Sequence, residues 1–175
     1  MIELPMSNLQ HRVLTSRERV KFAAADPYAH LSSGACVDMI MGHRVEALED
    51  IIGFSILRHA RTGVAFPARS IQVAYLRPSF VGEALEVGSW IETLGTSSFE
   101  VRAVIAGAGD RKARAAARIH FVAVDAATGR PVPVPATLPS NAPSDPTVAL
   151  PMSAIWLADV QGLPDGWVEP VPDIT

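Results

Sequence analysis

The sequence is poor in cysteine, in aromatic residues and in long apolar stretches. Of its 175 residues, only Cys36 is a cysteine, so no internal disulfide can form and a reducing cytoplasm is the expected compartment. No run of 18 apolar residues occurs, and residues 1–12 lack a basic segment followed by an apolar one. We therefore expect neither a membrane partner nor a secretory signal.

Charge and motif content exclude several functional classes. The net charge of −3 argues against a nucleic-acid partner, since such proteins usually carry a basic excess. No G-x-S-x-G elbow, phosphate-binding loop or dinucleotide fingerprint is present, which argues against an α/β-hydrolase and against nucleotide cofactors. His43 and Glu46 share a helix face, but no second histidine follows at ligand spacing, so we expect no metal and no cofactor.

The distribution of proline divides the chain in two. Ten of the fourteen prolines fall between Pro131 and Pro172, and the residues before them have the patterns of regular structure. We expect one domain over residues 1–139 and a proline-rich tail over residues 140–175. Within the tail, only residues 153–160 have the composition of a short helix.

The longest helical pattern covers residues 34–53, which are apolar on nearly every face and end at Gly53. Such a helix should be surrounded by other elements, and Gly42 near its middle suggests a close approach. An initial strand is expected at residues 18–24. Four later segments alternate apolar and polar residues and are separated by turn signals, at residues 69–76, 84–94, 98–105 and 112–124. Short connections make these strands antiparallel, so the expected fold is α+β, with a curved five-stranded sheet around the helix.

The segment between the first strand and the helix carries a more specific signal. Asp26–Pro27 is followed by His30, Leu31, Ser32 and Ser33, and then by the helix. This pattern resembles the hotdog-fold 4-hydroxybenzoyl-CoA thioesterase family and related acyl-CoA thioester hydrolases, over roughly residues 17–139. The sequence departs from the family's usual pattern in three ways: serines replace two asparagines, Cys36 replaces an aromatic residue, and Met41 stands where some relatives have a glutamate.

The resemblance implies an acyl-CoA thioesterase that releases a free acid and coenzyme A. Asp26 is the expected general base or attacking carboxylate, with His30 orienting it or polarising the substrate. The helix N-terminus at Gly34, Ala35 and Cys36, with Ser33, is expected to contact the substrate and its developing oxyanion. The residues expected to bind coenzyme A, which is part of the substrate, are Arg77, Ser97 and Ser98. The family also implies a homo-oligomer, either a dimer or a dimer of dimers.

Other readings of the same residues remain open at this stage. Asp26 before a proline can simply start a turn, Ser33 can cap the helix, and Cys36 can be a small buried side chain rather than a nucleophile. Basic residues on the strands, among them Arg102 and Arg114, can pair with glutamates across the sheet. Two alternative functions also remain: a hydratase or dehydratase acting on acyl thioesters, and a non-catalytic acyl-CoA-binding domain.

Overall fold

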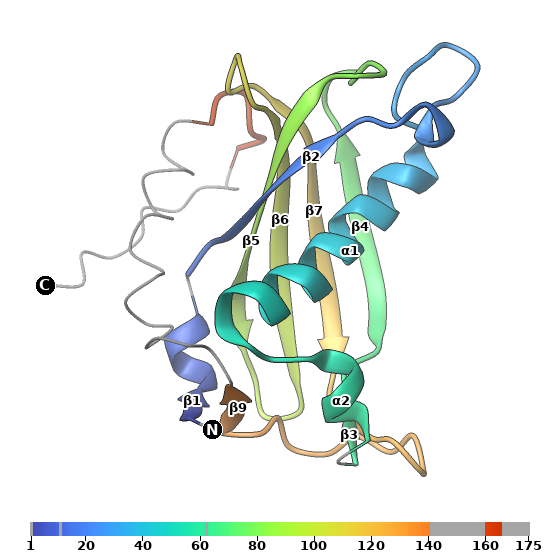
Figure 1. Cartoon of the computed structure of the whole chain (residues 1–175). Coiled ribbons are helices and arrows are strands. Elements are labelled where there is room, and N and C mark those ends of the chain that lie inside the picture. The colour runs from blue at the N-terminus through green and yellow to red at the C-terminus, as the bar shows by residue number, and fades with distance from the viewer. Residues whose placement is uncertain (1, 11, 62, 141–159, 166–175) are drawn as a thin grey trace, which may run out of the picture.

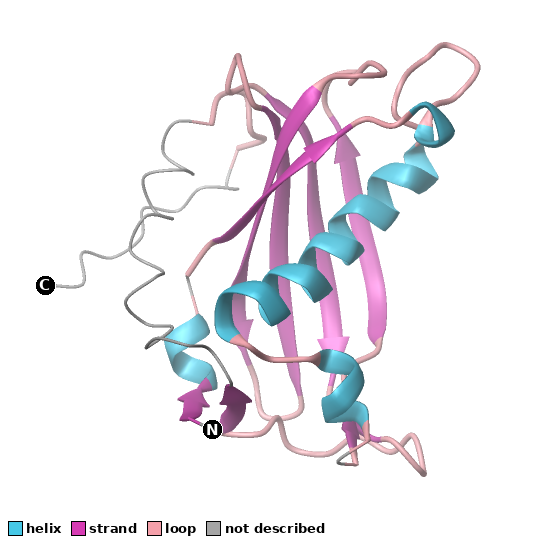
Figure 2. Cartoon of the chain, in the orientation of Figure 1, coloured by secondary structure: helices cyan, strands magenta, loops and turns pink. Residues whose placement is uncertain are grey.

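The computed structural model describes residues 2–10, 12–61, 63–140 and 160–165, in which one long helix crosses the face of an antiparallel sheet (Figure 1; Figure 2). The five main strands lie in the order β2-β5-β6-β7-β4, and β1–β9 and β3–β8 form two small ribbons. The elements are β1 (Ile2–Pro5), the 3₁₀ helix η1 (Met6–Leu9), β2 (Leu14–Arg19), the 3₁₀ helix η2 (Phe22–Ala24), α1 (Ser33–Ile52), α2 (Ile56–Ala60), β3 (Val64–Ala65), β4 (Ala68–Tyr75), β5 (Ala84–Leu94), β6 (Ser98–Gly107), β7 (Ala113–Val122), β8 (Val124–Asp125) and β9 (Thr137–Ser140). This arrangement confirms the α+β class. None of the helices in these ranges is long and apolar enough to cross a bilayer.

Both ends of α1 are capped by local hydrogen bonds. The Ser32 hydroxyl accepts a hydrogen bond from the Ala35 amide at 3.2 Å, so Ser32 is the N-cap and Ser33 is the first helical residue. At the other end, Gly53 adopts a left-handed φ of 66° and donates its amide hydrogen to the Glu49 carbonyl. The helix therefore ends at the glycine expected from the sequence, while the capping role considered for Ser33 belongs to its neighbour.

The helix packs on one side only. Cys36, Ile40, Ala47 and Leu48 are buried in the main core, which they share with inward-facing residues of β6 and β7. Asp38, Glu46 and Glu49 are exposed on the other side. The prediction of a helix enclosed on all sides is thus wrong for a single chain, because the sheet covers one face and the acidic face meets solvent.

The outer face of the sheet is partly covered by the C-terminal segment. Val104 and Ala106 of β6 form a second apolar cluster with Trp90 and Val160, and Gln161 accepts a hydrogen bond from the Ala113 amide at 2.9 Å. This part of the outer face is therefore shielded from solvent, because Val160 packs against it. Most of the short helix expected at residues 153–160 lies outside the described residues.

Gly42 provides a test of the packing of α1. A Cβ added at this position would meet no atom within 4 Å, so the expected close approach is not present within the described chain. Gly42→Ala should raise the free energy of unfolding by about 0.5–1 kcal/mol, because alanine loses less backbone entropy in a helix. Urea denaturation should show a higher midpoint with an unchanged slope. A lower midpoint would mean that another chain covers this face.

Candidate active site

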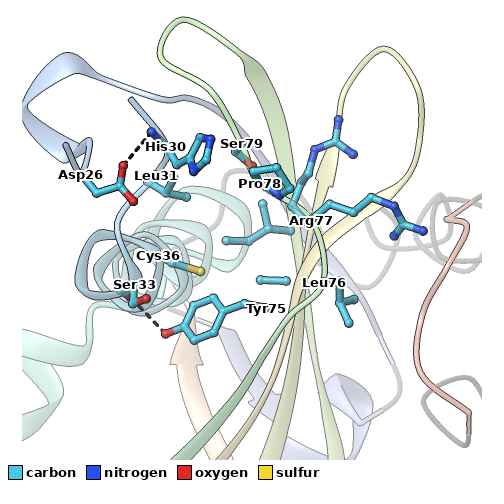
Figure 3. A pocket seen from close by; sticks show the side chains of 13 residues that line it. Asp26, His30, Leu31, Ser33, Cys36, Tyr75, Leu76, Arg77, Pro78 and Ser79 are labelled. Atoms are coloured by element: carbon cyan, nitrogen blue, oxygen red, sulfur yellow. Dashed lines mark hydrogen bonds between the residues drawn. The ribbon is translucent and has the colours of Figure 1, made fainter. Parts of the chain in front are cut away.

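A cavity of about 250 Å³ opens between the N-terminus of α1 and the adjoining ends of β4 and β7 (Figure 3). Five of the residues singled out from the sequence meet in its wall: Asp26, His30, Ser33, Cys36 and Arg77. The remaining lining residues are Leu31, Tyr75, Leu76, Pro78, Ser79, Ile105, Arg114 and Ala115. The loop before the helix and the end of strand β4 thus supply most of one site.

The two carboxylate oxygens of Asp26 have different surroundings. Oδ1 accepts hydrogen bonds from the backbone amides of Tyr28 at 2.9 Å and His30 at 3.0 Å, which closes the loop after Pro27. Oδ2 accepts no hydrogen bond from any described residue, and the side chain lines the cavity. The turn-forming role and the proposed chemical role of Asp26 are therefore compatible, because each uses a different oxygen.

His30 contacts Asp26 through its backbone rather than through its ring. Its carbonyl accepts a hydrogen bond from the Asp26 amide at 2.8 Å, and the intervening Ala29 has a left-handed φ of 60°. The imidazole packs edge-on against Phe80, with ring centroids 4.8 Å apart, and points away from the Asp26 carboxylate toward Ser79 (Figure 3). The ring is thus placed to contact a substrate, whereas the backbone of the loop orients the carboxylate.

The free amide groups at the start of α1 are those of Ser33 and Gly34. The Ala35 amide donates to the Ser32 hydroxyl and the Cys36 amide donates to the Ser32 carbonyl at 2.9 Å, so neither can bind an oxyanion. The amides of Ser33 and Gly34 donate to no acceptor among the described residues, and they carry the partial positive charge of the helix end. Ala35 lines a different cavity, of about 350 Å³, between α1 and β2. The amides left free beside the cavity are therefore those of Ser33 and Gly34, whereas the sequence pointed to the segment from Gly34 to Cys36.

Cys36 contributes packing rather than a thiolate. The side chain is buried, and burial raises the pKa of the thiol to about 11. At neutral pH the sulfur is almost entirely protonated and is a poor nucleophile. This favours the interpretation of Cys36 as a small apolar side chain in the cavity wall.

Arg77 and Arg114 bring positive charge to the side of the cavity opposite Asp26, where Figure 3 places Arg77. Arg114 is neutralised by Glu83 at 2.6 Å and Asp110 at 3.0 Å. Arg77 donates to the Ala113 carbonyl at 2.9 Å and has no carboxylate partner in the described parts of the chain. Its guanidinium lies against Gly162, where a Cβ would come within 2.6 Å of it. Arg77 is thus the cation available to an anionic ligand.

Ser97 and Ser98 do not join this site. Ser97 precedes β6 and Ser98 is its first residue, whereas the cavity is lined by Ile105 near the other end of that strand. Seven residues of extended strand span about 23 Å, so the two serines lie far from the wall of the cavity in the same chain. Arg102, another basic residue considered from the sequence, pairs with Glu92 at 3.3 Å on the outer face.

Tyr75 is a site residue that the sequence did not indicate. It belongs to the alternating segment at residues 69–76, and its side chain is 55% exposed at the end of β4. Its hydroxyl donates to the Ser33 carbonyl at 3.3 Å (Figure 3). Tyr75 therefore ties the edge strand to the first turn of α1, beside the free amide groups.

Solved structures of similar shape come from several bacteria. A 1,4-dihydroxy-2-naphthoyl-CoA thioesterase from Synechocystis superposes with a TM-score of 0.65 at 18% identity, covering 70% of this chain and 90% of that one. The probable thioesterase YbaW from Escherichia coli gives 0.62 at 21% identity, covering 69% and 89%. A Thermus thermophilus thioesterase complexed with coenzyme A and zinc gives 0.58 at 24% identity, covering 69% and 90%. These similarities confirm the hotdog fold.

The sequence comparisons identify the family directly. None of the curated proteins matches the sequence significantly. The model of the thioesterase-like superfamily matches residues 20–141, a range that contains the loop of Asp26, the whole of α1 and four of the five main strands, all but β2. The chain therefore belongs to the thioesterase-like superfamily.

Proposed function

We propose that the protein is an acyl-CoA thioesterase, which hydrolyses an acyl thioester to a free acid and coenzyme A. The observation that carries the proposal is the unengaged Oδ2 of Asp26, which shares one cavity with the free end of α1. Membership of the thioesterase-like superfamily supports the reaction type. Several solved structures of the same fold are named as thioesterases of CoA thioesters, which supports the choice of carrier.

The arrangement suggests how hydrolysis proceeds. The thioester carbonyl oxygen binds at the amides of Ser33 and Gly34, which stabilise the negative charge that develops on it. Asp26 then removes a proton from an attacking water, or attacks the carbonyl carbon itself and is later released by water. Either route adds hydroxide to the acyl group, breaks the C–S bond and returns a proton to the thiolate. This chemistry requires no cofactor beyond the coenzyme A of the substrate, and we propose none.

The alternatives differ in what they release. A hydratase or dehydratase adds or removes water across a carbon–carbon bond and leaves the thioester intact, whereas a binding domain saturates without turnover. A panel of acyl-CoA substrates with colorimetric detection of free thiol, run beside an enoyl-CoA hydration assay, separates the three. We expect thiol release with at least one acyl group. Hydration without thiol release, or saturable binding without either reaction, would overturn the proposal.

Arg77 is proposed to bind a phosphate of coenzyme A. Arg77→Gln should raise the KM for CoA thioesters about tenfold or more, since a charge-assisted hydrogen bond contributes roughly 1.5–3 kcal/mol, and should change kcat little. The matching N-acetylcysteamine thioester lacks phosphates, so its hydrolysis should be unaffected. Arg130→Gln, at an exposed position outside the cavity wall, serves as the control. An equal loss of activity with both substrates would show that Arg77 contributes to the chemical step rather than to binding of coenzyme A.

We propose that the chain self-associates through β4. This strand is at one edge of the sheet and pairs only with β7 among the described strands, and Ile71 and Tyr75 on it are 36% and 55% exposed. A second copy pairing along this edge would cover both side chains and add a wall to the cavity beside Tyr75. Either a dimer or a dimer of two such dimers would give the free edge of β4 a strand to pair with.

Light scattering at micromolar concentration should therefore give at least twice the mass of one chain. Ile71→Lys, which places a charge on the edge strand, should shift the protein toward monomer and lower activity. A fully active monomer would contradict the proposal.

We further propose a cytoplasmic location, because the only cysteine is unpaired and buried.

A further inference from the structure

A short C-terminal segment, residues 160–165, lies at one end of the main sheet beside the turn between β6 and β7 (Figure 1). The Gln161 amide donates to the Arg111 carbonyl, and the Gln161 carbonyl accepts from the Ala113 amide, both at 2.9 Å. Val160 is buried in the apolar cluster on the outer face of the sheet. Hydrogen bonds and apolar packing therefore hold this segment against the sheet.

Gly162 brings the backbone of the C-terminal segment against the side chain of Arg77. Its φ of 75° is left-handed, a conformation that glycine adopts without steric cost. A Cβ at this position would lie 2.6 Å from Nη2 and 2.7 Å from Nη1 of Arg77, which is shorter than a van der Waals contact. The guanidinium can therefore occupy its place only because Gly162 has no side chain. Leu163, the next residue, packs against the same apolar cluster as Val160, so the chain is anchored on both sides of the glycine.

Ala113 links Arg77 to the same segment. Its carbonyl accepts a hydrogen bond from Arg77 Nη1 at 2.9 Å, while its amide donates to Gln161. The backbone amide of Arg77 donates to the Arg114 carbonyl at 3.1 Å, so both the main chain and the side chain of Arg77 are attached to β7. Arg77 is nevertheless exposed to solvent. Its charge is therefore held in one place and is still accessible to an anion.

We propose that the C-terminal segment positions the guanidinium of Arg77 for a phosphate of coenzyme A, with Gly162 as the positioning residue. The inference rests on the proposed role of Arg77 in binding the carrier. A mobile arginine side chain loses conformational entropy when it binds an anion, and contacts that hold it beforehand reduce this loss. Gly162 does not line the cavity, so its effect on affinity is exerted through Arg77.

Gly162→Ala tests this role, because the added methyl group must displace the guanidinium. The Nε–Hε signal of Arg77 in the NMR spectrum, identified by its absence in Arg77→Gln, should move in the variant without any ligand present. The dissociation constant for coenzyme A should rise about three- to tenfold, because a charge-assisted hydrogen bond is weakened. Pantetheine lacks the phosphates of coenzyme A, so the preference for coenzyme A over pantetheine should fall.

Gly129→Ala is the matched control for backbone strain. Gly129 also has a left-handed φ, of 69°, but a Cβ there would meet no atom within 4 Å, and the residue does not line the cavity. The control should leave both the Arg77 signal and the dissociation constant for coenzyme A unchanged. Circular dichroism melting checks that both alanine variants are folded.

The double variant Gly162→Ala/Arg77→Gln shows whether the effect passes through Arg77. With Arg77 already replaced, Gly162→Ala should weaken the binding of coenzyme A no further. Three results would overturn the inference: an unmoved Arg77 signal in Gly162→Ala, an equal loss of affinity for coenzyme A and pantetheine, or a full additional loss in the double variant. None of these measurements needs thiol release, so a failure of the thioesterase proposal would be recognised separately, in the substrate panel.

Discussion

Asp26→Asn is expected to lower the rate of thioester hydrolysis by about 10²–10⁴-fold while leaving the fold intact. The loop should be preserved because the asparagine carbonyl oxygen can accept the same hydrogen bonds from Tyr28 and His30 as Oδ1 does. The free oxygen is replaced by an amide nitrogen, which neither takes a proton at neutral pH nor attacks a carbonyl carbon. Loss of such a group corresponds to roughly 3–5 kcal/mol of activation free energy.

The measurement is kcat/KM by thiol release, with circular dichroism melting to check the fold. Cys36→Ser is the matched control in the same cavity and should change turnover little, because the thiol is protonated at neutral pH. His30→Ala should cost less than Asp26→Asn, because the loop uses only the backbone of His30. Wild-type turnover in Asp26→Asn, or its loss in Cys36→Ser, would refute the mechanism.

Acidification should destabilise the protein through His43. Its pKa is about 4 in the folded chain and about 6.5 when unfolded, so between these values the unfolded state binds a proton that the native state does not. The contribution of His43 is therefore fully present above pH 6.5 and is lost as the pH falls toward 4. A difference of this size corresponds to roughly 3 kcal/mol.

Urea denaturation at pH 7 and at pH 4.5 should show this loss in the wild type. Other groups also titrate in this range, so the informative quantity is the difference between the wild type and His43→Gln. The variant has no imidazole to protonate and should lose clearly less stability over the same interval, whatever its stability at pH 7. An identical pH dependence in the two proteins would show that His43 is not the group responsible.

Elements with strong periodicity were predictable from the sequence, and those defined by distant partners were not. The strand expected at residues 84–94 has the same bounds as β5, and α1 differs from its prediction by one residue at each end. The first strand was expected at 18–24 but spans Leu14–Arg19. The strand ends at Arg19 because its partner β5 begins at Ala84, and Val20 bonds instead to the turn before β5, its amide donating to Glu83 and its carbonyl accepting from Gly82. Gly82 and Glu83 are more than 60 residues away in the sequence, whereas the local alternation of apolar and polar residues continues beyond Arg19. The alternation therefore does not reveal where the strand ends.

The residues of the candidate site also differ in how far the sequence could predict them. The loop residues Asp26, His30 and Ser33 were identifiable because they are close together in the sequence and precede a helix. Tyr75 and Arg114 join them because β4 and β7 are neighbours in the sheet order, which alternation within each strand does not reveal. The position of the free amide groups depended on whether Ser32 or Ser33 caps the helix, and adjacent serines give no basis for that choice.

The packing of Val160 on the outer face has a consequence for the order of folding. Its cluster joins residues as far apart as Val13 and Val160, so the last contacts close a loop of nearly the whole chain. During synthesis the helix and all five main strands emerge well before residue 160, and the domain can assemble while Trp90 and Val104 are still uncovered. Contacts of such long sequence separation form late and slowly, and an uncovered apolar surface favours aggregation. Emergence of the segment around Val160 from the ribosome should therefore be the event that protects this surface.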